Sequence, residues 1–220
     1  MDGVQHMRQK YIPRISAAVC AAVALCFTLT AFAAAEDDYR EGFRFYQTGD
    51  VTTAMARLKK AADVGHAPAQ VLLADILDQA EFNEEAVSYY RKAAEQGNAD
   101  GEFGLGSMIA NGEGVKRDAA EARKWITRAA DKNHARAIAT LAQAYINGGL
   151  AIEEKQRNGE DARRWITRAA DSSYPPALDY LAKAYRTGML GLAVDVKQAE
   201  ALETRARTIR GVTAGKKEKK

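Results

Sequence analysis

Residues 125–131 read WITRAAD, and residues 165–171 repeat the same seven letters. Looser copies stand at residues 57–63 (RLKKAAD) and 89–95 (YYRKAAE), and a shorter one stands at residues 202–206 (LETRA). A phrase that returns along a chain indicates a structural unit that returns with it. We therefore expect five tandem repeats.

Small residues mark two positions in every repeat. From each second marker to the next first marker the spacing is always 20 residues, whereas the spacing inside a repeat varies from 12 to 20 residues. The constant spacing predicts a packed junction between neighbouring repeats, and the variable one predicts a surface loop that tolerates insertion. The first markers are Gly42, Ala74, Gly106, Ala142 and Ala182, and the second are Ala54, Ala86, Ala122, Ala162 and Ala199.

Apolar residues recur at helical spacing around each marker, as in Ala122, Trp125 and Ala129. This period predicts amphipathic helices, two in each repeat. Small residues in the apolar stripe allow helix axes to approach to about 8–10 Å. A left-handed residue is expected to end the second helix at three repeats, namely at Gly65, Gly97 and Asn133.

The first 35 residues have the pattern of a secretory signal peptide. Arg8, Lys10 and Arg14 precede an uncharged stretch over 15–35, which closes on small residues with A-x-A spacing. We expect a signal peptide at 1–35, a repeat domain at 36–210 and a disordered lysine-rich tail at 211–220. The alternative is an uncleaved inner-membrane anchor, because 21 apolar residues can span a bilayer.

Composition narrows the classes of function. The chain has 220 residues, 47% hydrophobic, with a net charge of +3, and it shows no basic stripe with interleaved aromatics of the kind that binds nucleic acid. Both cysteines, Cys20 and Cys26, fall in the expected signal peptide, so the mature chain would hold no thiol for a disulfide, a zinc site or a nucleophile.

The third repeat resembles the Sel-one-like repeat (SLR) family. The resemblance rests on residues 99–115 (ADGEFGLGSMIANGEGV) and 118–130 (DAAEARKWITRAA), where glycines, valine, tryptophan and paired alanines match the two helices and the glycine loop of that family. The fourth and fifth repeats are similar with longer loops, and the first two look like tetratricopeptide repeats. The resemblance covers about residues 38–210.

The resemblance implies an all-α fold, a right-handed α-solenoid of about five helix-turn-helix repeats. It also implies a role in protein–protein contact, in the assembly or regulation of envelope, polysaccharide, motility or signalling machinery. A few cysteine-rich relatives are credited with binding or hydrolysing β-lactams, but their paired cysteines are missing here. Fold alone does not give function.

In repeats of this kind the side chains on one face of each first helix form the concave surface. The resemblance implies the same surface for this chain. This concave stripe runs from aromatic through acidic to polar and basic side chains, which suits an extended peptide or a partner helix. The predicted partner-binding residues are Tyr39, Phe43, Tyr46, Gln47, Asp75, Asp78, Phe103, Asn111, Gln143, Asn147, Lys183 and Arg186, with Gln79, Asp100, Ser107, Arg136 and Asp179 in the same stripe.

Candidates for chemistry have structural interpretations. His66 and His134 occupy equivalent places two repeats apart, so we expect turn residues that bond the backbone and no shared metal. Trp125 and Trp165 lie on the apolar stripe and are expected in the core. Carboxylate pairs, such as those at 84–85, 153–154 and 160–161, fall in loops or at helix starts, where acids favour the helix dipole.

The sequence therefore predicts an exported, periplasmic repeat scaffold that binds another protein or peptide and catalyses nothing. No cofactor, metal, nucleic acid or lasting membrane insertion is expected. Two alternatives stay open. One is an envelope hydrolase acting on β-lactams or peptidoglycan, with a site in the charged loop at 153–160, and the other is a membrane-anchored adaptor that keeps its first helix.

Overall fold

The computed structural model describes residues 17–217, and it describes side chains over 32–211. Within these residues the chain is helical and has no β-strand beyond an isolated bridge between Gly149 and Ile152. The helices are α1 (Ala17–Gln47), α2 (Val51–Asp63), α3 (Ala67–Gln79), α4 (Asn83–Glu95), α5 (Ala99–Asn111), α6 (Ala119–Asp131), α7 (Ala135–Asn147), α8 (Glu160–Asp171), α9 (Pro175–Thr187) and α10 (Val196–Lys217), with short 3₁₀ turns η1 (Glu154–Gln156) and η2 (Met189–Gly191).

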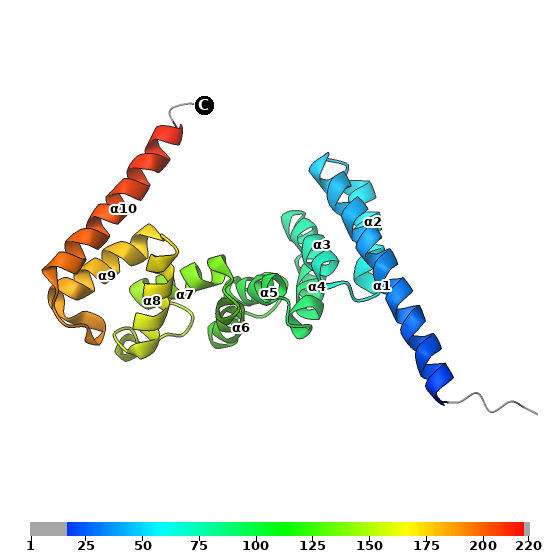
Figure 1. The fold of residues 1–220 in the computed structure, drawn as a ribbon, viewed down its shortest axis with the longest axis horizontal. Coiled ribbons are helices and arrows are strands. Elements are labelled where there is room, and N and C mark those ends of the chain that lie inside the picture. The colour runs from blue at the N-terminus through cyan, green and yellow to red at the C-terminus, as the bar shows by residue number, and fades with distance from the viewer. Residues whose placement is uncertain (1–16, 218–220) are drawn as a thin grey trace, which may run out of the picture.

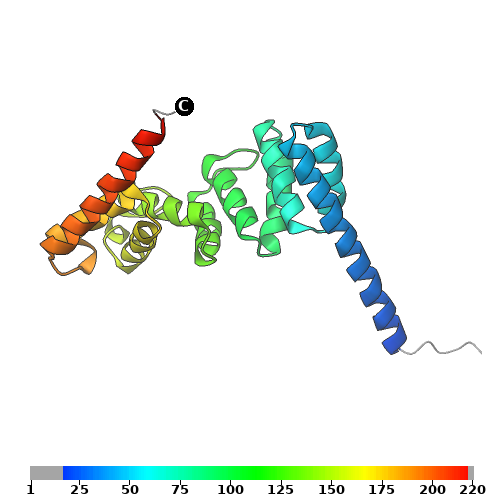
Figure 2. The same ribbon diagram turned by 45° about the horizontal axis from the view of Figure 1, so that its top comes forward.

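The helices form five hairpins in a row. Figures 1 and 2 show α1 and α2 at one end and α9 and α10 at the other, with the remaining pairs between them. Each helix packs on the next one along the chain, and the buried residues run through the whole row in two adjoining clusters. The predicted α-solenoid of five helical hairpins is confirmed.

Side-chain caps begin most of the helices. A carboxylate or amide oxygen accepts a backbone N–H in the first turn of α2, α5, α6 and α10. At α6, for example, Asp118 Oδ1 accepts from Ala120 N and Glu121 N at 2.9 Å. Such caps satisfy donors that have no partner inside the helix. They explain why helix starts coincide with Asp and Asn in the sequence.

One turn joins each hairpin to the next. The residues that end the turn all place their backbone N–H on the carbonyl of the residue five positions earlier, at 3.0–3.1 Å. The residue before each of them has positive φ. This geometry is that of a Schellman turn, and it fixes three connecting residues every time. The positive-φ residues are Gly65, Gly97, Asn133 and Ser173, so the three predicted positions are confirmed and Ser173 was missed.

Small residues set the distance between helices. The ten marker residues are all buried. A Cβ placed on Gly42 would lie 2.8 Å from Leu58 Cγ, and a Cβ on Gly101 would lie 2.6 Å from Ala93 Cβ and 2.9 Å from Ala94 N. Real Cβ atoms do not approach so closely, so α5 can lie this near α4 only because residue 101 is glycine.

Arginines at one repeat position tie successive hairpins together. Arg168 donates to the carbonyl oxygen of Ala130 at 2.9 Å, and Arg205 donates to that of Asp171 at 2.9 Å. Both carbonyls lie at the C-terminal end of the preceding second helix, where backbone acceptors lack helical partners and the dipole favours a cation. The arginine of the second WITRAAD copy and its equivalent in the fifth repeat therefore each bridge two repeats.

The variable connections lie where insertion was expected, inside the hairpins. In the fourth repeat the long loop folds back on its own hairpin, because Arg157 donates to the carbonyl oxygens of Tyr145 and Ile146. The loop contains η1 and buries Ile152. Asn158 also accepts the backbone N–H of Leu190 in the fifth repeat, so two neighbouring loops are joined.

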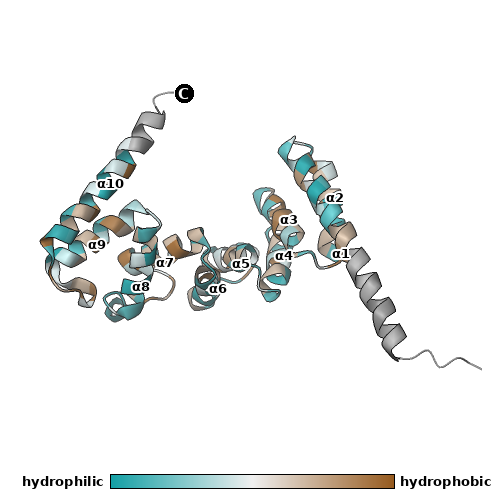
Figure 3. Cartoon of the chain, in the orientation of Figure 1, coloured by the Kyte–Doolittle hydropathy of each residue, from teal (hydrophilic) through white to brown (hydrophobic). Residues whose placement is uncertain are grey.

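The last helix closes the core at the C-terminal end. α10 buries Ala199 and Ala206 and exposes polar residues such as Glu200, Thr204 and Arg207, and Figure 3 shows its mainly hydrophilic surface. No separate capping helix is needed when the outer face is polar. The backbone is helical through Lys217, and the disordered tail expected at 211–220 stays a prediction. Residues 218–220 lie outside the described part, and the domain limit at 210 stays a prediction.

The first helix continues through the expected cleavage region. α1 is unbroken from Ala17 to Gln47, Ala35 is buried, and Glu36 lies against the second repeat through His66. Residues 1–16 lie outside the described residues, as do the side chains of both cysteines. Within the described part, no helix combines the length and apolar character that crossing a membrane requires. The signal peptide stays a prediction.

We predict that Gly101→Ala lowers the free energy of unfolding by about 1–3 kcal/mol, the usual cost of overpacking. The added Cβ would meet backbone atoms of α4, which cannot rotate away. Gly211→Ala is the matched control, because nothing lies within 4 Å of a Cβ there and alanine favours a helix. Urea denaturation measures both variants. Equal midpoints for the two would contradict the close approach.

Candidate functional site

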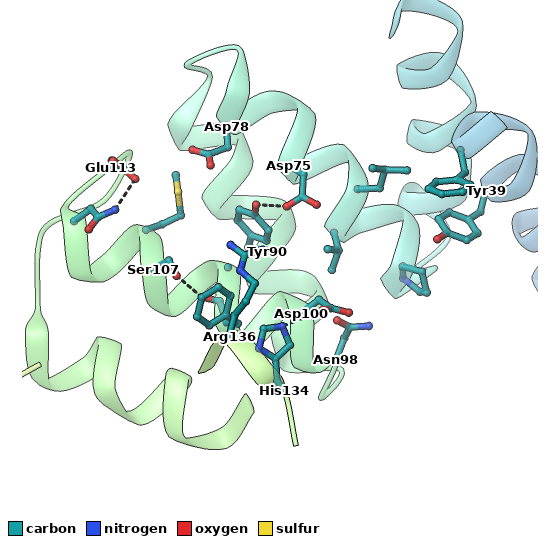
Figure 4. Close-up of a pocket in the computed structure, with 18 residues that line it drawn as sticks. Tyr39, Asp75, Asp78, Tyr90, Asn98, Asp100, Ser107, Glu113, His134 and Arg136 are labelled. Carbon is teal, nitrogen blue, oxygen red and sulfur yellow. Dashed lines mark hydrogen bonds and ion pairs between the residues drawn. The ribbon is translucent and has the colours of Figure 1, made fainter. Parts of the chain in front are cut away.

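A groove of about 480 Å³ runs along the first helices of the first three hairpins and ends at the start of α7. Side chains of α1, α3 and α5 form its walls, and Figure 4 shows their polar ends converging on one space. Its acidic lining residues are Asp75, Asp78, Asp100 and Glu113, and its aromatic ones are Tyr39, Phe43, Tyr90 and Phe103.

Half of the predicted partner-binding residues line this groove. They are the ones from the first three repeats that face the concave side: Tyr39, Phe43, Asp75, Asp78, Phe103 and Asn111. Asp100, Ser107 and Arg136 of the same stripe also line it. Two more predicted residues, Gln143 and Asn147, line a separate shallow hollow on α7, where Gln143 accepts the hydroxyl of Tyr174 at 2.7 Å.

Four predicted residues are not in either hollow. Tyr46 is half-buried against the core, and Gln47 and Lys183 are exposed outside the groove. Arg186 forms an ion pair with Glu203 of α10 at 2.9 Å. The side chain that the sequence assigned to a partner is therefore already paired within the chain. The predicted stripe is therefore continuous only over the first three repeats.

The residue that sequence reasoning missed is Tyr90. It lies on α4, a second helix, yet its ring reaches between α3 and α5 to the groove, where the hydroxyl donates to Asp75 Oδ1 at 2.5 Å. The passage exists because residue 104 is glycine, where a Cβ would lie 2.3 Å from Tyr90 Cε1.

A signal for this pair was present in the repeat alignment. At the position of Tyr90 the neighbouring repeats carry aliphatic Leu58, Ile126 and Ile166. At the position of Gly104 they carry larger residues, namely Arg40, Leu72, Thr140 and Tyr180. A large polar ring opposite a missing side chain marks a local departure from the repeat. Departures of this kind point to function more directly than the shared positions, which serve packing.

Asp75 and Asp78 are partly buried, and each lies near the negative charge of other acids of the groove. Burial raises the pKa of Asp75, and the charges of Asp100 and Asp78 add to the rise, although the Tyr90 hydroxyl bond lowers it. Burial likewise raises the pKa of Asp78, helped by the charge of Glu113. The pKa of Tyr90 lies above its usual range, chiefly through burial and then through Asp75. At neutral pH the phenol therefore stays protonated and donates to the carboxylate.

The cation that the chain itself places beside these acids is Arg136. Its guanidinium lies 4.7 Å from the centroid of the Phe103 ring, a cation–π distance, and Phe103 is nearly buried beneath it. The same ring stacks on His134 with centroids 4.7 Å apart. Phe103, a predicted partner-binding residue, therefore forms a largely buried wall of the groove.

Comparison with protein families agrees with the hairpin boundaries. The Sel1 repeat model matches residues 83–98, 99–134 and 135–174, and the last two segments correspond to the third and fourth hairpins. The solved structures described next have the same architecture. Residues 83–174 are Sel1 repeats. The suspected SLR resemblance is confirmed, and Sel1 repeats generally form scaffolds for protein–protein contacts.

A protective antigen present in uropathogenic Escherichia coli strains, which displays an SLR fold, aligns with 79% of this chain at 27% identity and a TM-score of 0.70. The alignment spans 38% of the antigen's length. A Sel1 repeat protein from Oxalobacter formigenes aligns over 84% of this chain and 76% of its own, at 24% identity and a TM-score of 0.61. A sel1 repeat protein from Klebsiella pneumoniae subsp. pneumoniae aligns over 86% and 93%, at 22% identity and a TM-score of 0.54.

The last two likenesses establish the shared fold alone, because their identity is low. The comparison with curated proteins gives no match.

Both histidines among residues 32–211 bond the backbone at helix starts, as the sequence predicted. His66 and His134 are the N-caps of α3 and α7, and Nδ1 of each accepts the backbone N–H three residues on, at 3.2 and 3.1 Å. Because Nδ1 accepts, Nε2 carries the hydrogen and donates to Glu36 or Asp100 at 3.1 Å. Each histidine thus ties one hairpin to the next.

The tryptophans and one acid complete the account of unusual residues. Trp165 is buried as predicted, whereas Trp125 is only partly buried and lies under Arg128, 4.5 Å from its guanidinium carbon. Glu102 was missed: it is fully buried and accepts from Arg128 and Lys132 at 2.8 Å. A buried charge needs such partners, so Glu102 is a structural residue of the third hairpin.

We predict that His134→Ala lowers the free energy of unfolding by about 0.5–2 kcal/mol, the usual cost of losing an N-cap. His134→Asn should lose much less, because Asn98 caps the preceding first helix, α5, by accepting from Gly101 N at 2.9 Å. Thermal or urea unfolding of the two variants measures the difference. Equal losses would mean that ring stacking on Phe103, and not the cap, is the contribution of His134.

Proposed function

We propose that this protein is an exported, periplasmic scaffold that holds a segment of another protein in the concave groove of its first three hairpins. The observation that supports this most is the groove itself, into which three successive first helices place aromatic and acidic side chains. Extended peptides and amphipathic helices bind such grooves through side chains spaced along their length. A role in assembling or regulating envelope machinery belongs to the same proposal.

The anchor for a partner is the exposed Phe43, beside the half-buried Tyr39, at the α1 end of the groove. Phe43 is 41% exposed, and its ring centroid lies 6.3 Å from that of Tyr39. Exposed aromatic side chains often dominate the binding energy of an interface because they bury a large area at a small entropic cost. Polar groups further along the groove would then determine which segments fit.

Ser107 and His134 of the groove bond the backbone of their own helices and not each other. Ser107 donates its hydroxyl to the carbonyl of Phe103 at 2.9 Å, and His134 Nδ1 caps α7, so the two do not form a nucleophile and base. In the loop considered for a hydrolase, Glu153 pairs with Lys155 at 2.8 Å on the surface. No specific observation favours the hydrolase.

Export rests on the leader sequence. Basic residues, an uncharged stretch and an A-x-A ending precede Glu36 in the order that signal peptidase substrates have. A cut before Ala34 would keep Ala35, which is buried, and a cut before Glu36 would keep the carboxylate that accepts from His66. Either cut leaves the groove residues in place.

We predict that Phe43→Ala reduces capture of the protein's envelope partner by about fivefold or more, the effect of losing an interface anchor worth at least 1 kcal/mol. Phe82→Ala is the matched control, because Phe82 is 57% exposed but lies outside the groove, at the turn between α3 and α4. Quantitative mass spectrometry of proteins retained from an envelope extract gives the ratio. Equal retention by both variants would count against the groove.

We predict that the exported protein begins at Ala34 or Glu36. N-terminal sequencing of the product from the native envelope fraction measures this directly. A chain that keeps Met1 and sediments with membranes would replace the periplasmic scaffold with the membrane-anchored adaptor.

A further inference from the structure

We propose that the partner segment carries a lysine or arginine whose charged end binds between Asp75, Asp78 and Glu113, with its hydrocarbon stem on the aromatic and aliphatic wall of the groove. This inference rests on the proposed function, since it names the chemistry of the segment that the groove receives. Charge, the Tyr90–Asp75 pair and the shape of the wall support it independently.

Charge is the first argument. Four carboxylates line the groove, and the cationic side chain that lines it, Arg136, already lies on the Phe103 ring. Asp100 accepts from His134 and Glu113 accepts from Asn111 at 3.2 Å, whereas among the described residues no hydrogen bond or ion pair is found for the Asp78 side chain. Burial raises the pKa of Asp75 and Asp78, and the charges of neighbouring acids add to the rise, so the groove repels a further anion and attracts a cation.

The second argument is that a hydrogen bond fixes the orientation of one carboxylate, that of Asp75. The Tyr90 hydroxyl holds Asp75 Oδ1, and Gly104 makes room for the ring that carries this hydroxyl. The first, third and fourth repeats place aliphatic residues at the position of Tyr90, and these pack without reaching the groove surface. The junction between the second and third hairpins therefore departs from the repeat at two residues, Tyr90 and Gly104. The result is an oriented carboxylate, that of Asp75, in the groove. Oriented acceptors bind cations better than mobile ones because less entropy is lost.

The third argument is the wall beside the acids. Val71, Leu72 and Met108 line the same groove as the aromatic rings of Tyr39 and Phe43. Lysine and arginine lay their methylene stems along such surfaces while the charged end reaches a polar site. A segment of acidic or short polar residues would leave this wall uncovered and would meet four carboxylates.

Selection of short random peptides displayed on phage tests the proposal. The immobilised proteins are the wild type, Asp75→Asn/Asp78→Asn, and the control Asp37→Asn/Glu95→Gln, which changes net charge equally at exposed sites outside the groove. We expect wild type and control to enrich peptides with lysine or arginine beside apolar residues. The groove double variant should lose this enrichment, and peptides selected on wild type should bind it about tenfold more weakly or worse.

The affinity of the same peptides, measured as a function of pH, gives a second test. Protonation of Asp75 and Asp78 removes the attraction, so affinity falls as the pH falls. Because burial raises their pKa, the fall should begin at a higher pH than for an exposed aspartate, whose pKa is about 3.9. The groove double variant should lack this early fall in affinity.

The outcomes separate the two proposals. Peptides that need Phe43 but show no preference for lysine or arginine would overturn the cation inference and keep the groove as a binding site. Equal enrichment of basic peptides by wild type and the groove double variant would also overturn it. Peptides that bind wild type and Phe43→Ala equally, with no preference for basic residues, would overturn both.

Discussion

The architecture depends on the Schellman turn that joins each hairpin to the next, at four places along the chain. In each, a residue with positive φ lets the next backbone N–H return to a carbonyl five residues earlier, and the donor residue then begins the following first helix. The end of one helix and the start of the next thus share a single hydrogen-bonded unit. Because its length cannot vary, the angle and offset between hairpins repeat, and a row of identical steps becomes a solenoid.

Packing reinforces this step from both sides. Buried alanines and glycines bring the helices close, and arginines from one hairpin bind the carbonyl end of the one before. The loops inside the hairpins do not take part in the step, so they vary in length without disturbing it. That freedom explains how the fourth and fifth hairpins carry long loops while keeping the same spacing to their neighbours.

The candidate site arises where the repeat is broken. Shared positions give every junction the same packing, and a surface made only of them would be uniform. At the junction of the second and third hairpins an aliphatic residue is replaced by Tyr90 and a side chain is removed at Gly104. The cost is a polar hydroxyl among apolar helices, and Asp75 offsets it by accepting the hydrogen bond. The same bond gives the groove an oriented charge.

The sequence alone determined the number of hairpins, the kind of turn between them and the roles of His66 and His134, because periodicity, capping and positive φ are properties of a few neighbouring residues. Counting along one helix face also selected six of the residues that line the groove, although Tyr46 and Gln47, counted in the same way, lie outside it. Only the tertiary structure decided that Arg186 is taken by Glu203, that Phe103 is a buried wall and that Glu102 is a paired interior charge. It alone showed that Tyr90 passes between two helices to reach Asp75. These contacts join residues 15 to 26 positions apart, and which of them form depends on how closely the helices pack, which local pattern does not state.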